Sequence, residues 1–182
     1  MITTRLKEET KELHQAVENE NLAYKIINHT ISAKEYLNLL KQNYAAYSSV
    51  EKAILKHEEK YKPIKFELLL KDLKQANANI ETLNSSFNLK NKDQSIGAQY
   101  VIKGSSLGSS FIAKQMLDCP ELKPFLPAYF FSTDKSAIKD WNKFTRFLKE
   151  NEAALNHDEV IVGAKKSFEH FLKIFTIPQI NQ

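Results

Sequence analysis

The chain has 182 residues, of which 42% are hydrophobic, and this suits a single domain over residues 1–182 with a core of ordinary size. Its formal net charge of +4, from 26 basic and 22 acidic residues, is too mild and dispersed to indicate a nucleic-acid partner. A lone cysteine, Cys119, excludes a disulfide within the chain and a cysteine-based zinc motif. No stretch approaches eighteen apolar residues and the N-terminus has no apolar signal core, so we expect a soluble, cytoplasmic protein without a membrane partner.

Hydrophobic residues recur at helical spacing along most of the chain, and strand alternation is almost absent. Leu6, Leu13 and Val17 form one stripe of a helix over residues 3–18, and Ser32 precedes a long helix over residues 33–59. Helices are also expected over residues 66–83, after a cap at Asp93 or Ser95, after a cap at Ser136, and over residues 158–175 with Val160, Ala164, Phe168, Phe171 and Phe175 toward the core. The run "DCPELKPFLPAYFFST" contains three prolines and predicts a loop or short turns. The expected fold class is therefore all-α, with roughly seven helices around one core.

Three of the four glycines, Gly97, Gly104 and Gly108, fall within the stretch "GAQYVIKGSSLGSSF". On a regular helix they would lie within about 20° of one line and form a stripe without side chains. Such a stripe permits either a close crossing by another helix or a flat ligand lying against the backbone. The neighbouring serines slightly favour the ligand, since their hydroxyls can bend a helix or organise water.

His14 is the candidate anchor for such a ligand. It lies at the edge of the apolar stripe of the first helix, and Lys7, Lys11, His14 and Glu18 form a second stripe along that helix. This stripe is also typical of a solvated face that happens to carry a histidine. Glu18, one turn beyond His14, could accept the proton of one ring nitrogen and leave the other to bind a metal. No two of the five histidines have the spacing of a shared metal site, which argues against a di-metal centre.

Two segments resemble signatures of the heme oxygenases. "LKEETKELHQAVENENL", Leu6 to Leu22, is similar to the N-terminal signature of that family, and "YVIKGSSLGSSFI", Tyr100 to Ile112, is similar to the distal helix of its bacterial members. The segment Val160 to Phe175 resembles the closing helix of the family, and Ala33 to Ile54 is more weakly similar. The resemblance implies a single all-α domain that holds heme between the first helix and a kinked, Gly/Ser-rich distal helix.

The resemblance also implies the roles of individual residues. His14 would be the proximal ligand of the heme iron and Glu18 its support, while Lys7 and Lys11 would meet the heme propionates. Lys139, Lys143 and Arg146 lie in "KDWNKFTR", which resembles the propionate-binding helix of the family. Gly104, Ser105, Gly108 and Ser109 would form the distal wall, where oxygen is activated. Heme would be both substrate and cofactor, with no separate metal.

The implied reaction opens heme to biliverdin, carbon monoxide and ferrous iron, with molecular oxygen and an electron-donating reductase or ferredoxin as partners. The resemblance is to a monomeric protein. Two positions depart from patterns found in the family. Ser109 replaces the second of two adjacent glycines, and Ser105 stands where some members have an aspartate that organises the distal water. A serine can orient water but cannot supply the same charge.

Other classes of protein remain as alternatives. A non-catalytic heme carrier or sensor would keep His14 and the glycines but would not convert heme when given electrons. A thiaminase-like helical enzyme would need a nucleophilic cysteine on a helix, whereas Cys119 lies beside Pro120 in an expected loop. A helical interaction module is the third alternative.

Overall fold

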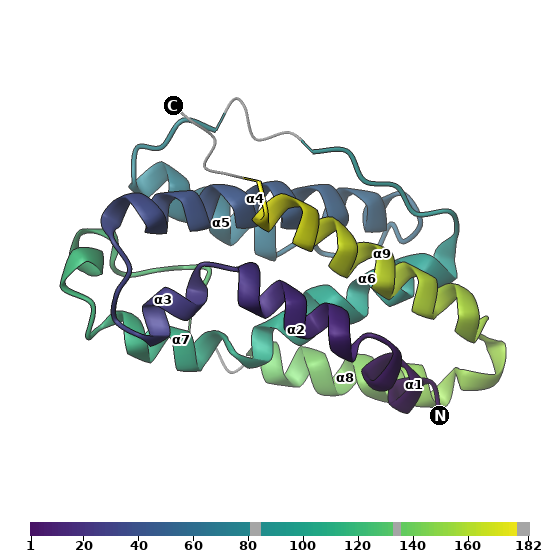
Figure 1. Ribbon diagram of the computed structural model, residues 1–182. Coiled ribbons are helices and arrows are strands. Elements are labelled where there is room, and N and C mark those ends of the chain that lie inside the picture. The colour runs from purple at the N-terminus through teal and green to yellow at the C-terminus, as the bar shows by residue number, and fades with distance from the viewer. Residues whose placement is uncertain (81–84, 133–135, 178–182) are drawn as a thin grey trace.

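A computed structural model describes residues 1–80, 85–132 and 136–177, and every regular element in these ranges is a helix (Figure 1). The α-helices are α1 (Ile2–Glu9), α2 (Lys11–Glu20), α3 (Ala23–Ile27), α4 (Ala33–Leu55), α5 (Lys65–Gln75), α6 (Lys92–Gly104), α7 (Ser109–Met116), α8 (Ser136–Glu150) and α9 (His157–Phe175). Short 3-10 helices are η1 (Ser105–Leu107), η2 (Pro120–Phe125) and η3 (Glu152–Ala154). The expected all-α fold is confirmed, and the proline-rich run forms η2 and loop as predicted.

Local hydrogen bonds explain where several helices begin. Ser32 and Glu35 form a reciprocal capping box at the start of α4, as the sequence indicates. The predicted cap of α6 is wrong: Asn91, rather than Asp93 or Ser95, accepts the backbone N–H of Gln94 at 2.9 Å. Ser136 is the first residue of α8 rather than its cap.

Helix ends are harder to predict than helix starts, because they depend on single backbone conformations. α5 ends at Gln75, well before the predicted residue 83, because Asn77 adopts a left-handed conformation with φ 51°. The backbone N–H groups of Asn77 and Ala78 then bond to the carbonyls of Lys74 and Leu73 and close the helix. Residues 81–83 of the predicted helix lie outside the described ranges. α4 likewise ends at Leu55 instead of residue 59.

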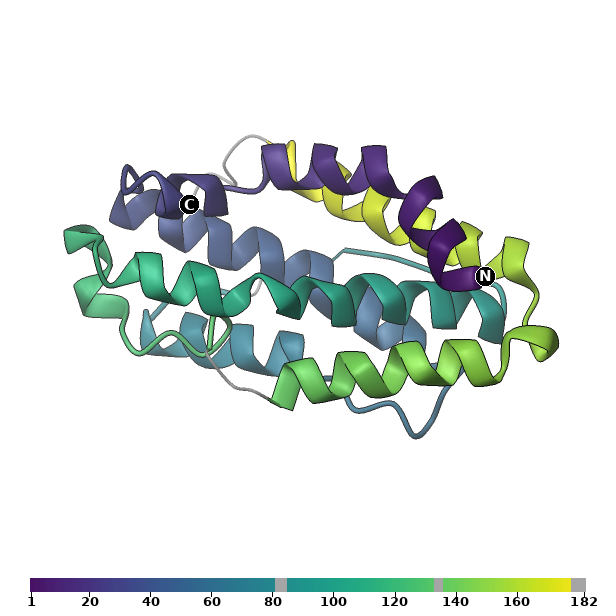
Figure 2. The same cartoon turned by 90° about the horizontal axis from the view of Figure 1, so that it is seen from below.

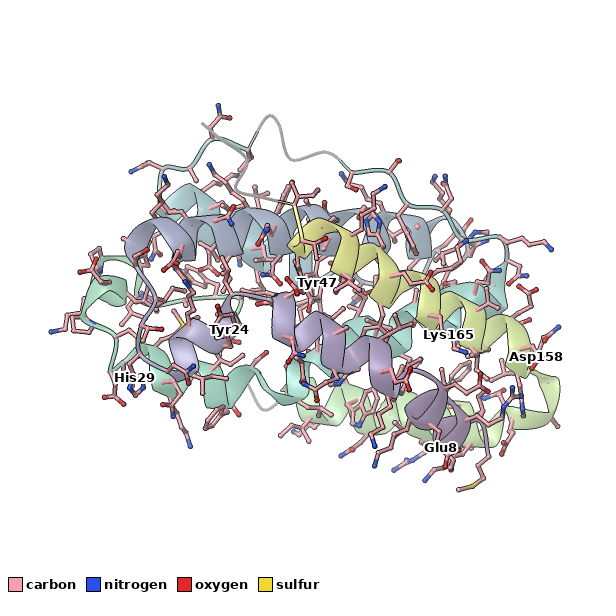
Figure 3. All side chains as sticks on the ribbon, in the orientation of Figure 1. Glu8, Tyr24, His29, Tyr47, Asp158 and Lys165 are labelled. Carbon is pink, nitrogen blue, oxygen red and sulfur yellow. The ribbon has the colours of Figure 1, made fainter. Side chains whose placement is uncertain are left out.

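The predicted helix over residues 3–18 is in fact two helices, α1 and α2, which meet at Thr10. The Thr10 hydroxyl donates a 2.6 Å hydrogen bond to the Leu6 carbonyl, and the backbone there leaves helical geometry at φ −106° and ψ 0°. Ion pairs hold α1 against α9: Arg5 contacts Asp158 at 3.0 Å, and Lys165 contacts Glu9 at 2.9 Å. Lys165 and Asp158 are labelled at this end of the molecule in Figure 3.

Helix α9 is the central packing element. It packs against α6, α2 and α4, and α4 in turn packs against α5 (Figures 1 and 2). The five α9 residues predicted to face the core, Val160, Ala164, Phe168, Phe171 and Phe175, are all buried. α9 therefore fixes the position of α2 relative to α6.

Two glycines permit the close approach of α6 and α9. A Cβ atom at Gly97 would lie 1.9 Å from the Val160 carbonyl oxygen, and a Cβ atom at Gly163 would lie 2.0 Å from the Gln94 carbonyl oxygen. Each helix thus presents bare backbone to the other. Of the two explanations for the glycine stripe, the close helix crossing is the correct one at Gly97.

Replacing Gly97 by alanine should destabilise the protein by about 1–3 kcal/mol or more, since the added methyl group forces two packed backbones apart. Gly108→Ala is the matched control: nothing lies within 4 Å of its Cβ position, and its φ of −88° suits alanine. The control should be neutral or stabilising by up to about 1 kcal/mol. Urea unfolding of both variants checks this, and equal effects would contradict the close crossing.

His170 is a half-buried titratable group in this core. Its Nε2 lies 2.7 Å from the Ser49 hydroxyl oxygen, whose single proton is directed at the backbone carbonyls of Ala45 and Ala46 at 2.8 and 2.9 Å. The ring nitrogen is therefore the donor, as a neutral imidazole allows. Burial, with a smaller contribution from Lys173, lowers the pKa of His170 to about 4.

The stability of the protein should consequently depend on His170 between pH 6.5 and 4. The pKa of this group is lower in the folded state than in the unfolded chain, so the unfolded chain takes up its proton first and the free energy of unfolding falls as pH drops through this window. His170→Gln should remove that part of the pH dependence. Urea unfolding gives the free energy of unfolding of the variant and of the natural protein at each pH. If both fall equally between pH 6.5 and 4, His170 is not the cause of the pH dependence.

Candidate functional site

His14 lies on α2 with half of its side chain open to solvent. Leu13 and Val17 of the same helix pack against the core, which turns the His14 side chain outward at 55% exposure. One side of the imidazole meets the Phe168 ring of α9 edge-on, with the ring centroids 5.5 Å apart. The histidine is thus held at its base while its remaining surface is free for a ligand.

Glu18 stands one turn beyond His14, as the spacing predicts. Its Oε1 is 3.6 Å from His14 Nε2, which is an ion-pair distance for a protonated ring and is longer than a hydrogen bond. In this arrangement Nδ1 is the ring nitrogen that faces away from Glu18, and a half-turn of the exposed ring would exchange the two nitrogens. The pair can therefore engage one nitrogen with the carboxylate and present the other to a metal.

Lys7 does not belong to the same helix as His14, which corrects the expected continuous stripe. Lys7 lies in the last turn of α1, whereas Lys11, His14 and Glu18 lie on α2, beyond the bend at Thr10. Lys7 and Lys11 are both exposed. The two cations remain near the start of α2, although a regular helical projection no longer describes their directions.

Contact between α6 and the start of α2 brings the two expected halves of the site together. Burial raises the pKa of Tyr100 of α6, and the nearby Thr10 side chain partly offsets that effect. Both views show α2 and α6 running in the same direction (Figures 1 and 2). His14 lies four residues after Thr10, and Gly104 lies four residues after Tyr100. His14 and Gly104 thus each follow this pair of residues by about one helical turn.

The glycine segment interrupts the helix. α6 ends at Gly104, η1 follows with tighter 3-10 geometry, and α7 starts at Ser109, so the predicted single helix is two helices joined by a short turn. The Ser105 hydroxyl donates to the Ile102 carbonyl at 2.8 Å, a bond that competes with regular helix. Gly108 has open space around its Cβ position and is exposed. Of the three glycines, Gly108 is the one whose surroundings leave room for a ligand.

Trp141 is a residue of this region that the sequence did not single out. A Cβ atom at Gly104 would lie 3.4 Å from Trp141 Cζ3, and the indole also meets the Tyr100 ring with centroids 5.5 Å apart. Its helix, α8, packs against α1, α6 and η1. The exposed cations Lys139, Lys143 and Arg146 on α8 are therefore carried by a helix that touches both halves of the site. Only the packing of α8 identifies Trp141, because an aromatic residue in an amphipathic helix is ordinarily a core residue.

Ser105 and Ser109 of the glycine segment lie in different environments. Ser105 interacts with Tyr47 of α4, a buried residue labelled in Figure 3, and burial, opposed by that interaction, raises the pKa of Tyr47 to about 12. Tyr47 therefore keeps its proton at neutral pH and can donate a hydrogen bond. Ser109 is buried and lines a separate cavity formed with α4, α5 and α8. Tyr47 appears in the sequence only as a helical core residue, and no local signal marks its contact with Ser105.

None of the helices in the described ranges has both the length and the apolar character that crossing a bilayer requires.

Comparisons with known proteins address the N-terminal part of the chain and its fold. The family model described as heme oxygenase matches residues 1–86, which include His14, Glu18 and all of α4 and α5. No curated protein matches the sequence significantly. Among solved structures, the NO- and CO-bound heme oxygenase from Neisseria meningitidis has the same fold, with a TM-score of 0.71 and 20% sequence identity, over 96% of this chain and 90% of that one. The heme oxygenase family model thus matches the N-terminal part of the chain, and the fold of the chain is that of a solved heme oxygenase over nearly its whole length.

Proposed function

We propose that the protein is a heme oxygenase that opens heme to biliverdin, carbon monoxide and ferrous iron, using oxygen and electrons from a reductase or ferredoxin. The observation that supports the proposal is an exposed imidazole, His14, on α2 beside the glycine segment that ends α6, since both helices pack against α9 and run in the same direction (Figures 1 and 2). One helix offers an exposed imidazole and the other offers a segment nearly free of side chains. A flat macrocycle with a metal at its centre could bind the imidazole through the metal and lie with its other face against the segment that is nearly free of side chains.

The residues of the proximal side bind and orient the substrate. His14 provides a neutral imidazole for the iron, and Glu18 orients the ring by accepting a hydrogen bond from its second nitrogen. Lys7 and Lys11 on one side, and Lys139, Lys143 and Arg146 on α8, offer exposed cations for the two propionates. Bound heme supplies both the redox chemistry of the reaction and the ring that is consumed.

The residues of the distal side leave space and hold protons. Gly108 keeps the face of the ring free of a side chain, and Gly104 lets Trp141 approach α6 closely. Ser105 and Tyr47 supply hydroxyl groups next to this segment, with Tyr47 protonated at neutral pH. They can order water there without the negative charge that an aspartate at position 105 would bring.

The decisive experiment adds hemin and a reductant under oxygen and follows the absorption spectrum. Loss of the heme band with appearance of biliverdin supports the enzyme. A heme complex that is stably reduced but not converted would identify the protein as a carrier or sensor instead.

His14→Ala should abolish the spectrum of a histidine-ligated ferric heme, because the other histidines of the chain lie outside α2. Added imidazole should restore that spectrum, since it can occupy the space of the missing ring. His29→Ala is a matched control. This exposed histidine lies in the connection between α3 and α4, and its Nε2 is 2.9 Å from Oε1 of Gln115 on α7. An unchanged spectrum in His14→Ala would assign the iron to another ligand.

Gly108→Leu should block turnover while leaving the protein folded. The apo protein has open space at this position, so leucine fits without displacing a neighbour, and it is the better helix former by roughly 0.8 kcal/mol. In the heme complex the same side chain would project toward the ring or the oxygen site. Thermal unfolding of the apo variant, heme titration and biliverdin yield are measured together. Normal turnover in a stable variant would remove Gly108 from the distal wall.

A further inference from the structure

A cavity lies beside the α6 to η1 segment, between α4, α5, α6 and α8. It has a volume of about 90 Å³, which exceeds the space that a single water needs several-fold. Its lining residues are Glu51, Tyr61, Lys62, Ile64, Lys65, Leu68, Ile102, Lys103, Ser106, Ser109, Phe130, Ser132, Ser136, Ala137 and Asp140. His14, Gly104 and Gly108 are not among them, whereas Ser109, which the resemblance implies for the distal wall, lines this cavity.

Lys65 is the most unusual residue of this cavity. Lys65 is only 8% exposed, and its ammonium group lies 5.1 Å from the centre of the Phe130 ring. Among the described residues, no acceptor forms a hydrogen bond or ion pair with it. Burial lowers the pKa of Lys65 to about 8, with a smaller opposing effect from Glu51. A buried cation without a carboxylate partner is costly, and an anion in the cavity would offset that cost.

Lys103 brings a second amine to the same cavity. Its ammonium group lies over the rings of Tyr61 and Phe144, at 5.7 and 5.9 Å from their centres. Burial lowers its pKa, with smaller effects from the charges of neighbouring residues, Asp140 first among them. Within the described part of the chain it too has no hydrogen bond or ion pair. Two amines on different helices therefore converge on one space.

The acidic groups of the cavity do not neutralise these amines. Glu51 is fully buried and already accepts hydrogen bonds from the Tyr61 hydroxyl at 2.8 Å and from three backbone N–H groups at the start of α5, those of residues 64, 65 and 66. Burial raises the pKa of Glu51, and these four hydrogen bonds oppose that effect. Asp140 is exposed, and water screens its carboxylate. Apart from Glu51, whose oxygens these hydrogen bonds occupy, the buried or half-buried charged groups of the cavity are the two amines.

Ser109 supplies a neutral hydrogen-bond donor. It is 7% exposed, lines the cavity, and its hydroxyl has no hydrogen-bond partner among the described residues. An oxyanion can accept from a hydroxyl and from ammonium groups at once, and such charge-assisted hydrogen bonds are the stronger ones. We propose that this cavity binds a small oxyanion, a carboxylate or a phosphate, between Lys65, Lys103 and Ser109.

The test uses the full chain without heme, so its result is independent of the proposed reaction. Inorganic phosphate and acetate are titrated separately, with chloride at matched ionic strength as the reference, while the Tm and the ammonium resonance of Lys65 are followed. A ligand that binds only the folded state raises Tm in a saturable way. We expect such a rise and a raised pKa of Lys65 with phosphate, acetate or both, and the tighter ligand identifies the anion class.

Lys65→Met should weaken binding roughly tenfold or more, as expected for the loss of a charge-assisted hydrogen bond. Lys74→Met, on the exposed face of the same helix, should leave binding unchanged. Ser109→Ala removes only a hydroxyl and tests the same site if the methionine variant does not fold. The proposal fails if neither anion raises Tm above the chloride reference, or if the lysine variants at 65 and 74 respond alike.

Discussion

The contact of bare backbone between α6 and α9 is the constraint on which the rest of the structure depends. Gly97 and Gly163 let the two helices touch at their main chains, closer than any side chain would allow. Because α2 also packs against α9, this contact sets the separation between α2 and α6. The distance between the histidine helix and the glycine segment is therefore determined by two residues that have no part in ligand binding.

Buried polar groups tie the loops to this helical frame. The Glu51 carboxylate holds the first turn of α5 through its backbone N–H groups, and Asp72 accepts from the backbone of Tyr129 and Phe130 at 2.7 and 2.8 Å. Each carboxylate is desolvated, which raises its pKa, and each recovers part of that cost through backbone hydrogen bonds. The same tether that caps α5 also positions Lys65 beside its cavity. One arrangement thus provides both the hydrogen bonds of Glu51 and a buried lysine, Lys65, which has no hydrogen bond or ion pair among the described residues.

The proposed heme site combines a rigid side with an open side. His14 has its ring edge against Phe168 of α9, whereas Gly108 faces free space and Ser105 to Leu107 form a loosened 3-10 turn. A wall without side chains can approach a flat substrate closely, and a 3-10 segment between two α-helices can change its bend at modest cost. The cations around this region are exposed and keep their flexibility until they meet a negatively charged group.

The sequence by itself determined the all-α class, the start of α4 at its capping box, the core face of α9 and the spacing of His14 and Glu18, because these follow from periodicity and contacts within a few residues. Only the tertiary structure decided that the first helix bends at Thr10, that Gly97 serves a helix crossing while Gly108 stays open, and that Trp141 lies against Gly104. These outcomes depend on which distant helix a residue meets. Lys65 is the sharpest case: in the sequence it resembles any surface lysine, and its burial exists only because α4, α6 and α8 close around the start of α5.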